Sequence, residues 1–236
     1  MTILALEFSS ARRSAAVLDL TEDSASPPSP GAGTRTPQRP PAKTAEAIET
    51  GEGGTKAFGL IEEALAGAGL AREQIEVIVV GLGPGSYTGI RVALSIGQGW
   101  QLARGVKLLG VSSADCLAAQ AQAEKIFGRV NVVIDAQRNE FYLASYEISS
   151  RDWKETRPLR IMSLAQLDPQ ASNDEIWVGP EVTRWFPKGS RLFPSAATLG
   201  RLAVGRRDFV SGDKLAPLYL RETNFIKAPP VNRFLL

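Results

Sequence analysis

The glycine-rich stretch at residues 80–92, VGLGPGSYTGIRV, is the part of the sequence whose residue types could best support chemistry. Its glycines permit backbone angles that other residues avoid, and Ser86 and Thr88 could cap the free N–H groups of a helix that follows. A helix N-terminus with free N–H groups also attracts anions. Two interpretations stay open: a structural turn, or an anion-binding loop formed by Gly83, Gly85, Ser86, Thr88 and Arg91.

Two familiar nucleotide-binding patterns do not fit this stretch. No lysine followed by serine or threonine comes after the glycines, so the loop is not of the Walker type. The spacing G-x-G-x-G, at a position far from the N-terminal strand, also fails the dinucleotide fingerprint.

The composition restricts the available catalytic groups. The 236 residues contain no histidine and a single cysteine, Cys116, which removes the commonest general base and excludes a disulfide framework or a cysteine-based zinc site. A nucleophilic Ser86 would lack a histidine partner, which argues against a peptidase. A kinase would need acids for magnesium and for the substrate hydroxyl. The candidates are Glu7, Asp19, Asp115 and Asp135.

We expect these acids to have structural roles. Glu7 falls in a core strand, where a satisfied polar group between two lobes is the favoured interpretation. Asp135 precedes a turn, where aspartate commonly caps the backbone. No convergent catalytic set emerges, and we expect no metal and no cofactor.

The elements that must position these residues alternate along the chain. Two apolar runs, 3–8 and 14–20, predict a β-hairpin, and a second hairpin is predicted at 129–135 and 140–148. Further strands are predicted at 75–80, 107–111, 158–162 and 175–178, with a late element at 217–221. Helical spacing predicts helices from an N-cap at Thr55 to a stop at Gly69, and at 88–103, 113–127 and 196–206.

A hairpin followed by helices thus occurs twice, beginning at residues 3 and 129. This repetition predicts an α/β protein with two duplicated lobes, an N-terminal lobe at 1–110 and a C-terminal lobe at 111–236. Residues 21–54 are rich in proline, serine and glycine, and we expect this segment to be mobile.

Charge and hydropathy bear on location and partners. The net charge is +2, but from Arg184 onward 10 basic residues face 3 acidic ones. This asymmetry fits either a solvated surface or a surface that meets phosphate or an acidic partner. There is no run of about 20 apolar residues and no signal-peptide pattern, so we expect a cytoplasmic protein without a membrane span.

The string GPGSYTGIR at 83–91 resembles the GPGSFTG(I/L/V)R loop of the TsaB (YeaZ) family, with Tyr87 in place of the usual phenylalanine. Further segments resemble the same family: ILALEFSS at 3–10, GVSSADCLAAQA at 110–121, IDAQRNEFYLASYE at 134–147 and PLYLRE at 217–222. Two positions depart from the family. Glu7 replaces a frequent aspartate, and the histidine often found before the first helix is absent from residues 53–56.

The resemblance implies an actin-like (ASKHA, ribonuclease H-like) fold and a non-catalytic role. The family takes part in attaching threonylcarbamoyl to the adenosine adjacent to the anticodon of tRNA. It implies two partners, the catalytic subunit TsaD in a heterodimer and the ATPase TsaE, with tRNA contacted indirectly or weakly. The alternative is an actin-like small-molecule kinase or ATPase.

The helix predicted at 88–103 suggests an interface independently of family. In the stretch 89–104 the only charges are Arg91 and Arg104, and a surface helix should be polar on its outer side. The small residues Gly89, Ala93 and Gly97 form a stripe that would admit a second helix. In the family the first two helices contact TsaD and also form homodimers. The predicted interface comprises Phe58, Ile61, Leu65, Gly89, Ala93, Gly97 and Trp100. The alternative is a helix enclosed within its own monomer.

Overall fold

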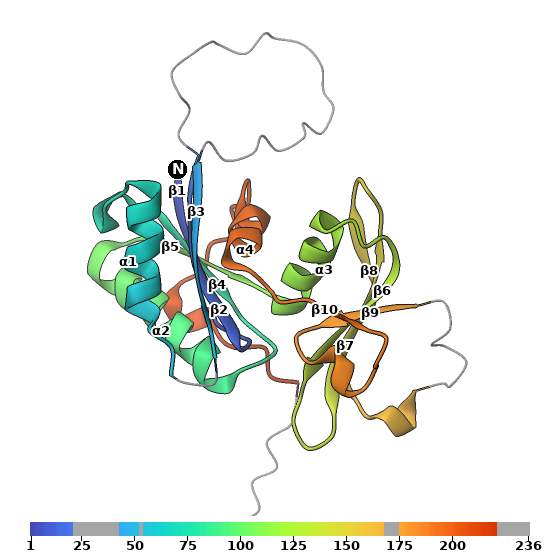
Figure 1. Cartoon of the computed structure of the whole chain (residues 1–236). Coiled ribbons are helices and arrows are strands. Elements are labelled where there is room, and N and C mark those ends of the chain that lie inside the picture. Colours follow the sequence, from blue (N-terminus) through green and yellow to red (C-terminus); the bar gives the residue numbers. More distant parts are fainter. Residues whose placement is uncertain (21–42, 52–53, 168–174, 221–236) are drawn as a thin grey trace, which may run out of the picture.

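The computed structural model describes residues 1–20, 43–51, 54–167 and 175–220, which form two five-stranded sheets (Figure 1). The first sheet contains β1 (Thr2–Glu7), β2 (Arg12–Asp19), β3 (Lys43–Thr50), β4 (Val77–Gly81) and β5 (Lys107–Val111). The second contains β6 (Gly128–Asp135), β7 (Phe141–Ile148), β8 (Trp153–Met162), β9 (Ile176–Gly179) and β10 (Ser190–Arg191). The segment 21–42, which we expected to be mobile, lies outside the described residues.

The two sheets share one topology. In each, three strands in sequence order form an antiparallel meander, and two later strands add in parallel beside the first strand of that meander. The orders are β3-β2-β1-β4-β5 and β8-β7-β6-β9-β10. The predicted repetition of an α/β unit is therefore confirmed at the level of strand order.

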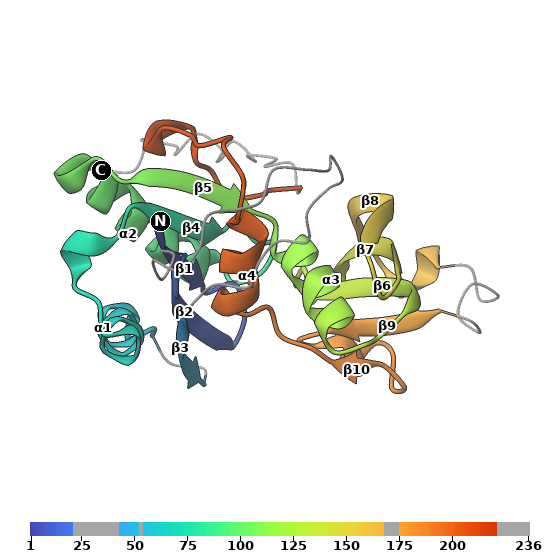
Figure 2. The ribbon, with the colours of Figure 1, turned by 90° about the horizontal axis from the view of Figure 1, so that it is seen from above.

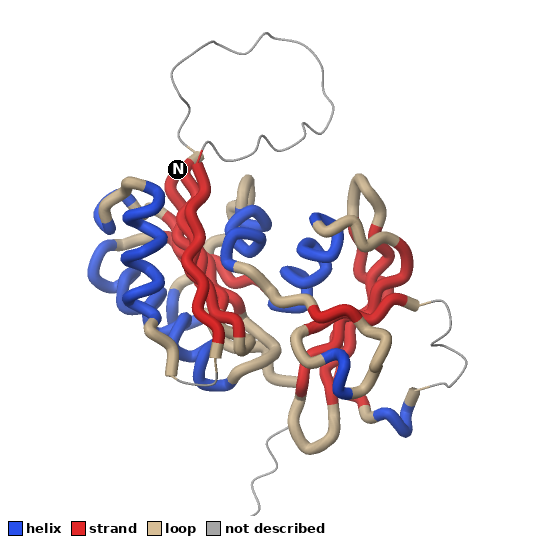
Figure 3. Tube along the Cα trace, in the orientation of Figure 1, coloured by secondary structure: helices blue, strands red, loops and turns tan. Residues whose placement is uncertain are grey.

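In the described part of the chain, four helices cover the sheets. Their bounds are α1 (Ala57–Ala68), α2 (Tyr87–Arg104), α3 (Ser113–Ala123) and α4 (Ala196–Ala203), and short 3₁₀ turns lie at Arg72–Gln74, Leu164–Gln166, Val182–Arg184 and Gly212–Lys214. Helices α1 and α2 pack on one face of the first sheet and α4 on the other, while α3 packs on the second sheet. Helices α3 and α4 contact each other between the two sheets (Figures 1, 2 and 3). No helix in these described ranges is long and apolar enough to cross a membrane.

The last part of the described chain returns to the first sheet. Helix α4 contributes Ala196, Leu199 and Ala203 to the core formed by β1, β2 and β4, and Val210 pairs with Leu108 of β5. The expected boundary near residue 110 coincides with the end of β5. We therefore propose a division in which the C-terminal lobe spans 111–195 and the remainder completes the N-terminal lobe.

The helix ends follow the local sequence only in part. Gly69 ends α1 in the left-handed conformation, as predicted. The N-cap is Lys56, without a side-chain cap, so the expectation of a cap at Thr55 is wrong. The reason lies in tertiary contact, because the N–H of Lys56 donates to Oε2 of Glu49 at 3.0 Å. Helix α3 ends at Ala123, four residues earlier than predicted.

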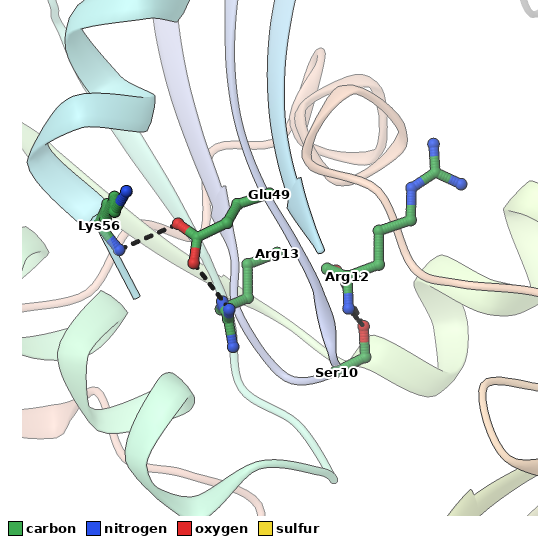
Figure 4. Close-up of polar contacts among 5 residues, drawn as sticks. All are labelled: Ser10, Arg12, Arg13, Glu49 and Lys56. Carbon is green, nitrogen blue, oxygen red and sulfur yellow. Dashed lines mark hydrogen bonds and ion pairs between the residues drawn. The ribbon is translucent and has the colours of Figure 1, made fainter. Parts of the chain in front are cut away.

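Strand β3 corrects the expectation that residues 43–54 would be mobile. It pairs antiparallel with β2 along its whole length, with Ala47 opposite Ala15. The carboxylate of Glu49 binds both Nη2 of Arg13, at 2.7 Å, and the N–H of Lys56 (Figure 4). The Lys56 N–H and the Arg13 guanidinium hold the pKa of Glu49 below its ordinary value. The low apolar content of residues 43–50 therefore led to a wrong prediction of mobility, because strand pairing with β2 and the Arg13–Glu49 ion pair hold this segment in the sheet.

Candidate functional site

The loop between β4 and α2 binds neighbouring backbone through its own polar groups. Ser86 donates its N–H to the carbonyl of Ser9 at 2.7 Å, and the carbonyl of Gly83 accepts from the N–H of Ser113 at 2.8 Å. The hydroxyl of Ser86 accepts from the N–H of Gly89 at 3.2 Å and caps α2, as predicted. The loop thus joins the β1–β2 turn, α2 and the start of α3.

The glycines of this loop are required by close packing. Gly85 has φ of 145°, and a Cβ there would overlap the carbonyl of Ser9. A Cβ at Gly81 would overlap the carboxylate of Glu7. These contacts favour the structural turn over the anion-binding loop. Anion binding by this loop stays a prediction.

Glu7 is fully buried at the end of β1 and is satisfied by protein groups. Its Oε1 accepts the N–H of Ser9 at 2.8 Å, and its Oε2 accepts the hydroxyl of Ser113 at 3.0 Å. Burial raises the pKa of Glu7, against the opposing effect of the hydrogen bonds from Ser9 and Ser113. This geometry supports the interpretation of Glu7 as a polar link between lobes.

Asp135 lies at the end of β6, where it organises the turn to β7. Its Oδ1 accepts the N–H of Gln137 at 2.7 Å, and its Oδ2 pairs with Nη1 of Arg184 at 2.7 Å. The first contact is the turn cap expected from the sequence. Burial raises the pKa of the neighbouring Glu181, whose carboxylate accepts the N–H of Asp135 at 3.5 Å.

A cleft of about 1140 Å³ lies between the two lobes. Turns from both hairpins line it, at residues 9–11 and 134–138, together with the start of α2, Glu181 and Tyr219. Of the four acids proposed for a kinase, only Asp135 lines this cleft. Asp19 sits opposite Thr2 at the other end of the sheet, and Asp115 accepts the hydroxyl of Tyr146 at 2.9 Å. The acids are therefore not brought together.

Within the described ranges, no group of three His, Cys, Asp or Glu side chains could hold a metal ion.

The small-residue stripe of α2 faces its own sheet, which corrects our expectation of a second helix there. A Cβ on Gly89 would overlap the carbonyl of Phe8, a Cβ on Gly97 would lie 3.3 Å from Val80, and Ala93 is fully buried. The buried side chains of Ile61 and Leu65 also belong to this internal core. The physical reason is the close packing of α2 on β4, so these five residues are not available to a partner.

The outer faces of α1 and α2 form an apolar groove of about 720 Å³, which we call the α1–α2 groove. Phe58 and Tyr87 expose 68% and 64% of their surface there, which is unusual for aromatic side chains. Its lining residues are Phe58, Tyr87, Thr88, Arg91, Val92, Ser95, Ile96, Gly99 and Trp100. Of the predicted interface residues, Phe58 is exposed and Trp100 is half-buried in this groove, on the face opposite the stripe.

Sequence reasoning missed Tyr219 as a part of this region. Its ring centroid lies 6.3 Å from that of Tyr87, and the guanidinium of Arg91 lies 3.3 Å from the centre of the Tyr87 ring. The N–H of Leu218 donates to the carbonyl of Leu82, which anchors the segment. The only signal in the sequence was that PLYLRE at 217–222 resembles a segment of the family, and this resemblance does not indicate which residues Tyr219 contacts.

Comparison with known proteins gives consistent sequence matches. The family model described as TsaD, tRNA N6-adenosine threonylcarbamoyltransferase, matches residues 55–216. The Haemophilus influenzae protein named tRNA threonylcarbamoyladenosine biosynthesis protein TsaB is 31% identical over 193 residues, covering 72% of this chain and 80% of that protein. The Escherichia coli protein of the same name is 28% identical over 181 residues, covering 69% of this chain and 78% of that protein.

A solved structure has the same fold. A Pseudomonas aeruginosa protein described as similar to peptidase YEAZ superposes with a TM-score of 0.74 at 23% identity. The match covers 93% of this chain and 99% of that one. A second structure, described as YeaZ from Pseudomonas aeruginosa, gives a TM-score of 0.73.

Proposed function

The chain belongs to the TsaB (YeaZ) family, and from this premise we propose that it is a non-catalytic subunit for threonylcarbamoyl transfer to tRNA. Its fold is the expected α/β actin-like (ASKHA) type with two related sheets. Its function is tRNA threonylcarbamoyladenosine biosynthesis, after the relatives that carry this name. The proposal concerns its part in that process, which is to bind and support the catalytic subunit TsaD.

The observation that carries the proposal is the α1–α2 groove. When a partner covers an exposed aromatic side chain, its apolar surface is removed from water. This burial stabilises the complex by about 25 cal/mol per Å² of apolar surface. Phe58 and Trp100 provide such surface on neighbouring helices. An apolar patch on rigid helices is a suitable site for a partner protein.

The arrangement of ionisable groups supports a non-catalytic role. The sequence has no histidine, Glu7 is buried and hydrogen-bonded, and Asp135 is engaged with a turn and with Arg184. A kinase would require two or more acids at one place in the cleft. The dispersed positions of Asp19 and Asp115 do not favour that alternative.

We further propose the set of partners and the location. TsaD would occupy the α1–α2 groove in a heterodimer, and TsaE would join the complex. In the absence of TsaD, a second copy of this chain would occupy the same groove and form a homodimer. Contact with tRNA would be indirect or weak, because Arg184 and Arg206 of the basic C-terminal part already pair with Asp135 and Asp208. The expected location is the cytoplasm.

The test is co-purification with TsaD of the same organism, followed by a tRNA modification assay with TsaD and TsaE, with and without this chain. We expect a complex, and modification only when the chain is present. The purified chain alone should hydrolyse neither ATP nor casein. Modification at full rate without the chain would contradict the proposal, and so would turnover of ATP or casein by the chain alone.

A further inference from the structure

Arg91 is a cation at the rim of the α1–α2 groove, and no acceptor among the described residues pairs with it. Its guanidinium lies over the Tyr87 ring at 3.3 Å and 5.2 Å from the centre of the Tyr219 ring. Its Nη1 is buried and makes no hydrogen bond. In the described part of the chain, Arg91 forms no ion pair. A guanidinium keeps its charge at physiological pH, so this donor is charged and unsatisfied.

Arg91 is also the only charged residue that lines the groove. The other lining residues are aromatic, aliphatic, small or hydroxyl-bearing, and none is acidic. A partner that covered the groove with apolar side chains alone would bury an unpaired guanidinium, which is strongly unfavourable. A productive partner must therefore bring an acceptor for Arg91.

We propose that the partner in the α1–α2 groove carries a carboxylate that pairs with Arg91, flanked by apolar side chains that pack on Phe58, Ile96 and Trp100. The inference rests on the proposed function and specifies the chemistry of the partner surface. A carboxylate fits the planar fork of arginine with two parallel hydrogen bonds. The rings of Tyr87 and Tyr219 hold the guanidinium in place, so little side-chain freedom is lost on binding.

Charge complementarity favours a different protein over a second copy of this chain. Two grooves placed face to face would bring together two arginines and no acid from the lining residues. An RNA phosphate is disfavoured because backbone recognition uses several cations, whereas this groove offers one among aromatic surfaces. On the cleft side of Arg91, the carboxylates of Asp135 and Glu181 already supply negative charge.

The test measures the dissociation constant for TsaD of wild type, Arg91→Met and Arg91→Lys over a range of salt concentrations. Arg91→Met should weaken binding about tenfold or more and reduce the salt dependence, because the charge pair is lost. Arg91→Lys should lie between, since it keeps the charge and loses the fork. Arg104→Met is the matched control, because Arg104 is on the same helix, lies outside the groove and pairs with Glu73 at 3.7 Å. It should bind as wild type does.

The possible outcomes distinguish two claims: that the groove is the interface, and that the partner brings a carboxylate to Arg91. If Arg91→Met binds TsaD as wild type while Phe58→Asp does not, the groove is the interface and the carboxylate is overturned. Should Arg91→Met lower binding of tRNA and leave TsaD binding intact, a phosphate would replace the carboxylate. If Arg91→Met fails to fold, undiminished binding by Arg91→Lys overturns the inference, because the lysine lacks the planar fork. Failure of wild type to bind TsaD would remove both the proposed function and this inference.

Discussion

The hydroxyl of Ser113 donates a 3.0 Å hydrogen bond to Oε2 of Glu7, which joins the start of α3 to the end of β1 across 106 positions. The N–H of the same serine donates to the carbonyl of Gly83. Both contacts lie where the chain leaves the first sheet for the second. A buried carboxyl group here serves as a connection between the lobes, and burial makes its charged form less favourable than in water.

Replacement of Glu7 tests this connection through pH. Because burial raises the folded-state pKa of Glu7 above the ordinary value of 4.5, the folded protein binds more protons than the unfolded chain above that pH. The free energy of unfolding should therefore fall as pH rises from 4.5 through the raised pKa. Glu7→Gln can still accept the N–H of Ser9 through its amide oxygen, and its amide N–H can donate to the hydroxyl oxygen of Ser113, which reverses that bond. It should remove this fall, measured by urea unfolding at several pH values. An unchanged pH slope in Glu7→Gln would contradict the assignment.

Glu7→Ala serves as the companion variant. It leaves the N–H of Ser9 and the hydroxyl of Ser113 without their acceptor and creates a cavity, so it should lower the free energy of unfolding by about 2–4 kcal/mol. Soluble Glu7→Ala should still support tRNA modification in the reconstituted system. A well-folded, assembled but inactive Glu7→Ala would show that the non-catalytic assignment is wrong.

Two glycines of α2 should respond to alanine in opposite ways. Gly89→Ala places a methyl group against the carbonyl of Phe8 and should cost about 1–3 kcal/mol. Gly99→Ala meets no atom within 4 Å and should gain about 0.8–1.0 kcal/mol from helix propensity. Chemical denaturation of both variants measures the difference. Equal stabilities would mean that α2 does not pack against the backbone of Phe8 as described.

A substitution on the inner face of α2 should affect folding, whereas one on the outer face of α1 should affect partner binding. Ala93→Glu buries a charge in the core and should greatly lower the melting temperature and the soluble yield. Phe58→Asp changes an exposed ring and should melt near wild type, yet abolish TsaD binding in size-exclusion chromatography. A well-folded Ala93→Glu that fails to bind would restore the small-residue stripe as the interface. Binding by Phe58→Asp would remove the groove from it.

The turn between β6 and β7 holds three consecutive non-glycine residues, Gln137, Arg138 and Asn139, at φ of 62°, 55° and 63°. The left-handed conformation costs roughly 1–2 kcal/mol per ordinary residue, so Arg138→Gly should raise the free energy of unfolding by about 1 kcal/mol. Arg129→Gly on β6 is the control and should lower it by about 0.5–1 kcal/mol. A loss of stability in Arg138→Gly would mean that its side chain contributes a contact that outweighs the strain.

Asp135→Ala should have a small effect. The ion pair with Arg184 is half-exposed on the arginine side and contributes about 0–1 kcal/mol, and loss of the cap to Gln137 adds a similar amount. We expect a thermal melt slightly below wild type and unchanged tRNA modification. Loss of modification in a folded Asp135→Ala complex would place this acid in the chemistry of the cleft.

The sequence by itself determined the local elements and the family. Runs such as 3–8 and 75–80 are apolar because the strands in the interior of the first sheet are buried on both faces. The Gly83–Arg91 loop carries a pattern specific enough to indicate relatives. Strand β3 was missed because its alternation, Thr-Ala-Glu-Ala-Ile-Glu-Thr, uses small and charged residues. Its place depends on pairing with β2 and on the contact of Glu49 with Arg13.

Only the tertiary structure decided which face of α2 is free. Periodicity shows that a helix has apolar and small residues on more than one side, but a glycine or alanine fits equally well against a strand or against a second helix. The overlap that a Cβ on Gly89 would make with Phe8 assigns the stripe to the interior. The approach of α1, which brings Phe58 to the outer side of α2, then defines the groove. The return of Tyr219 to Arg91 places an aromatic ring beside that groove, and both contacts join residues far apart in the chain.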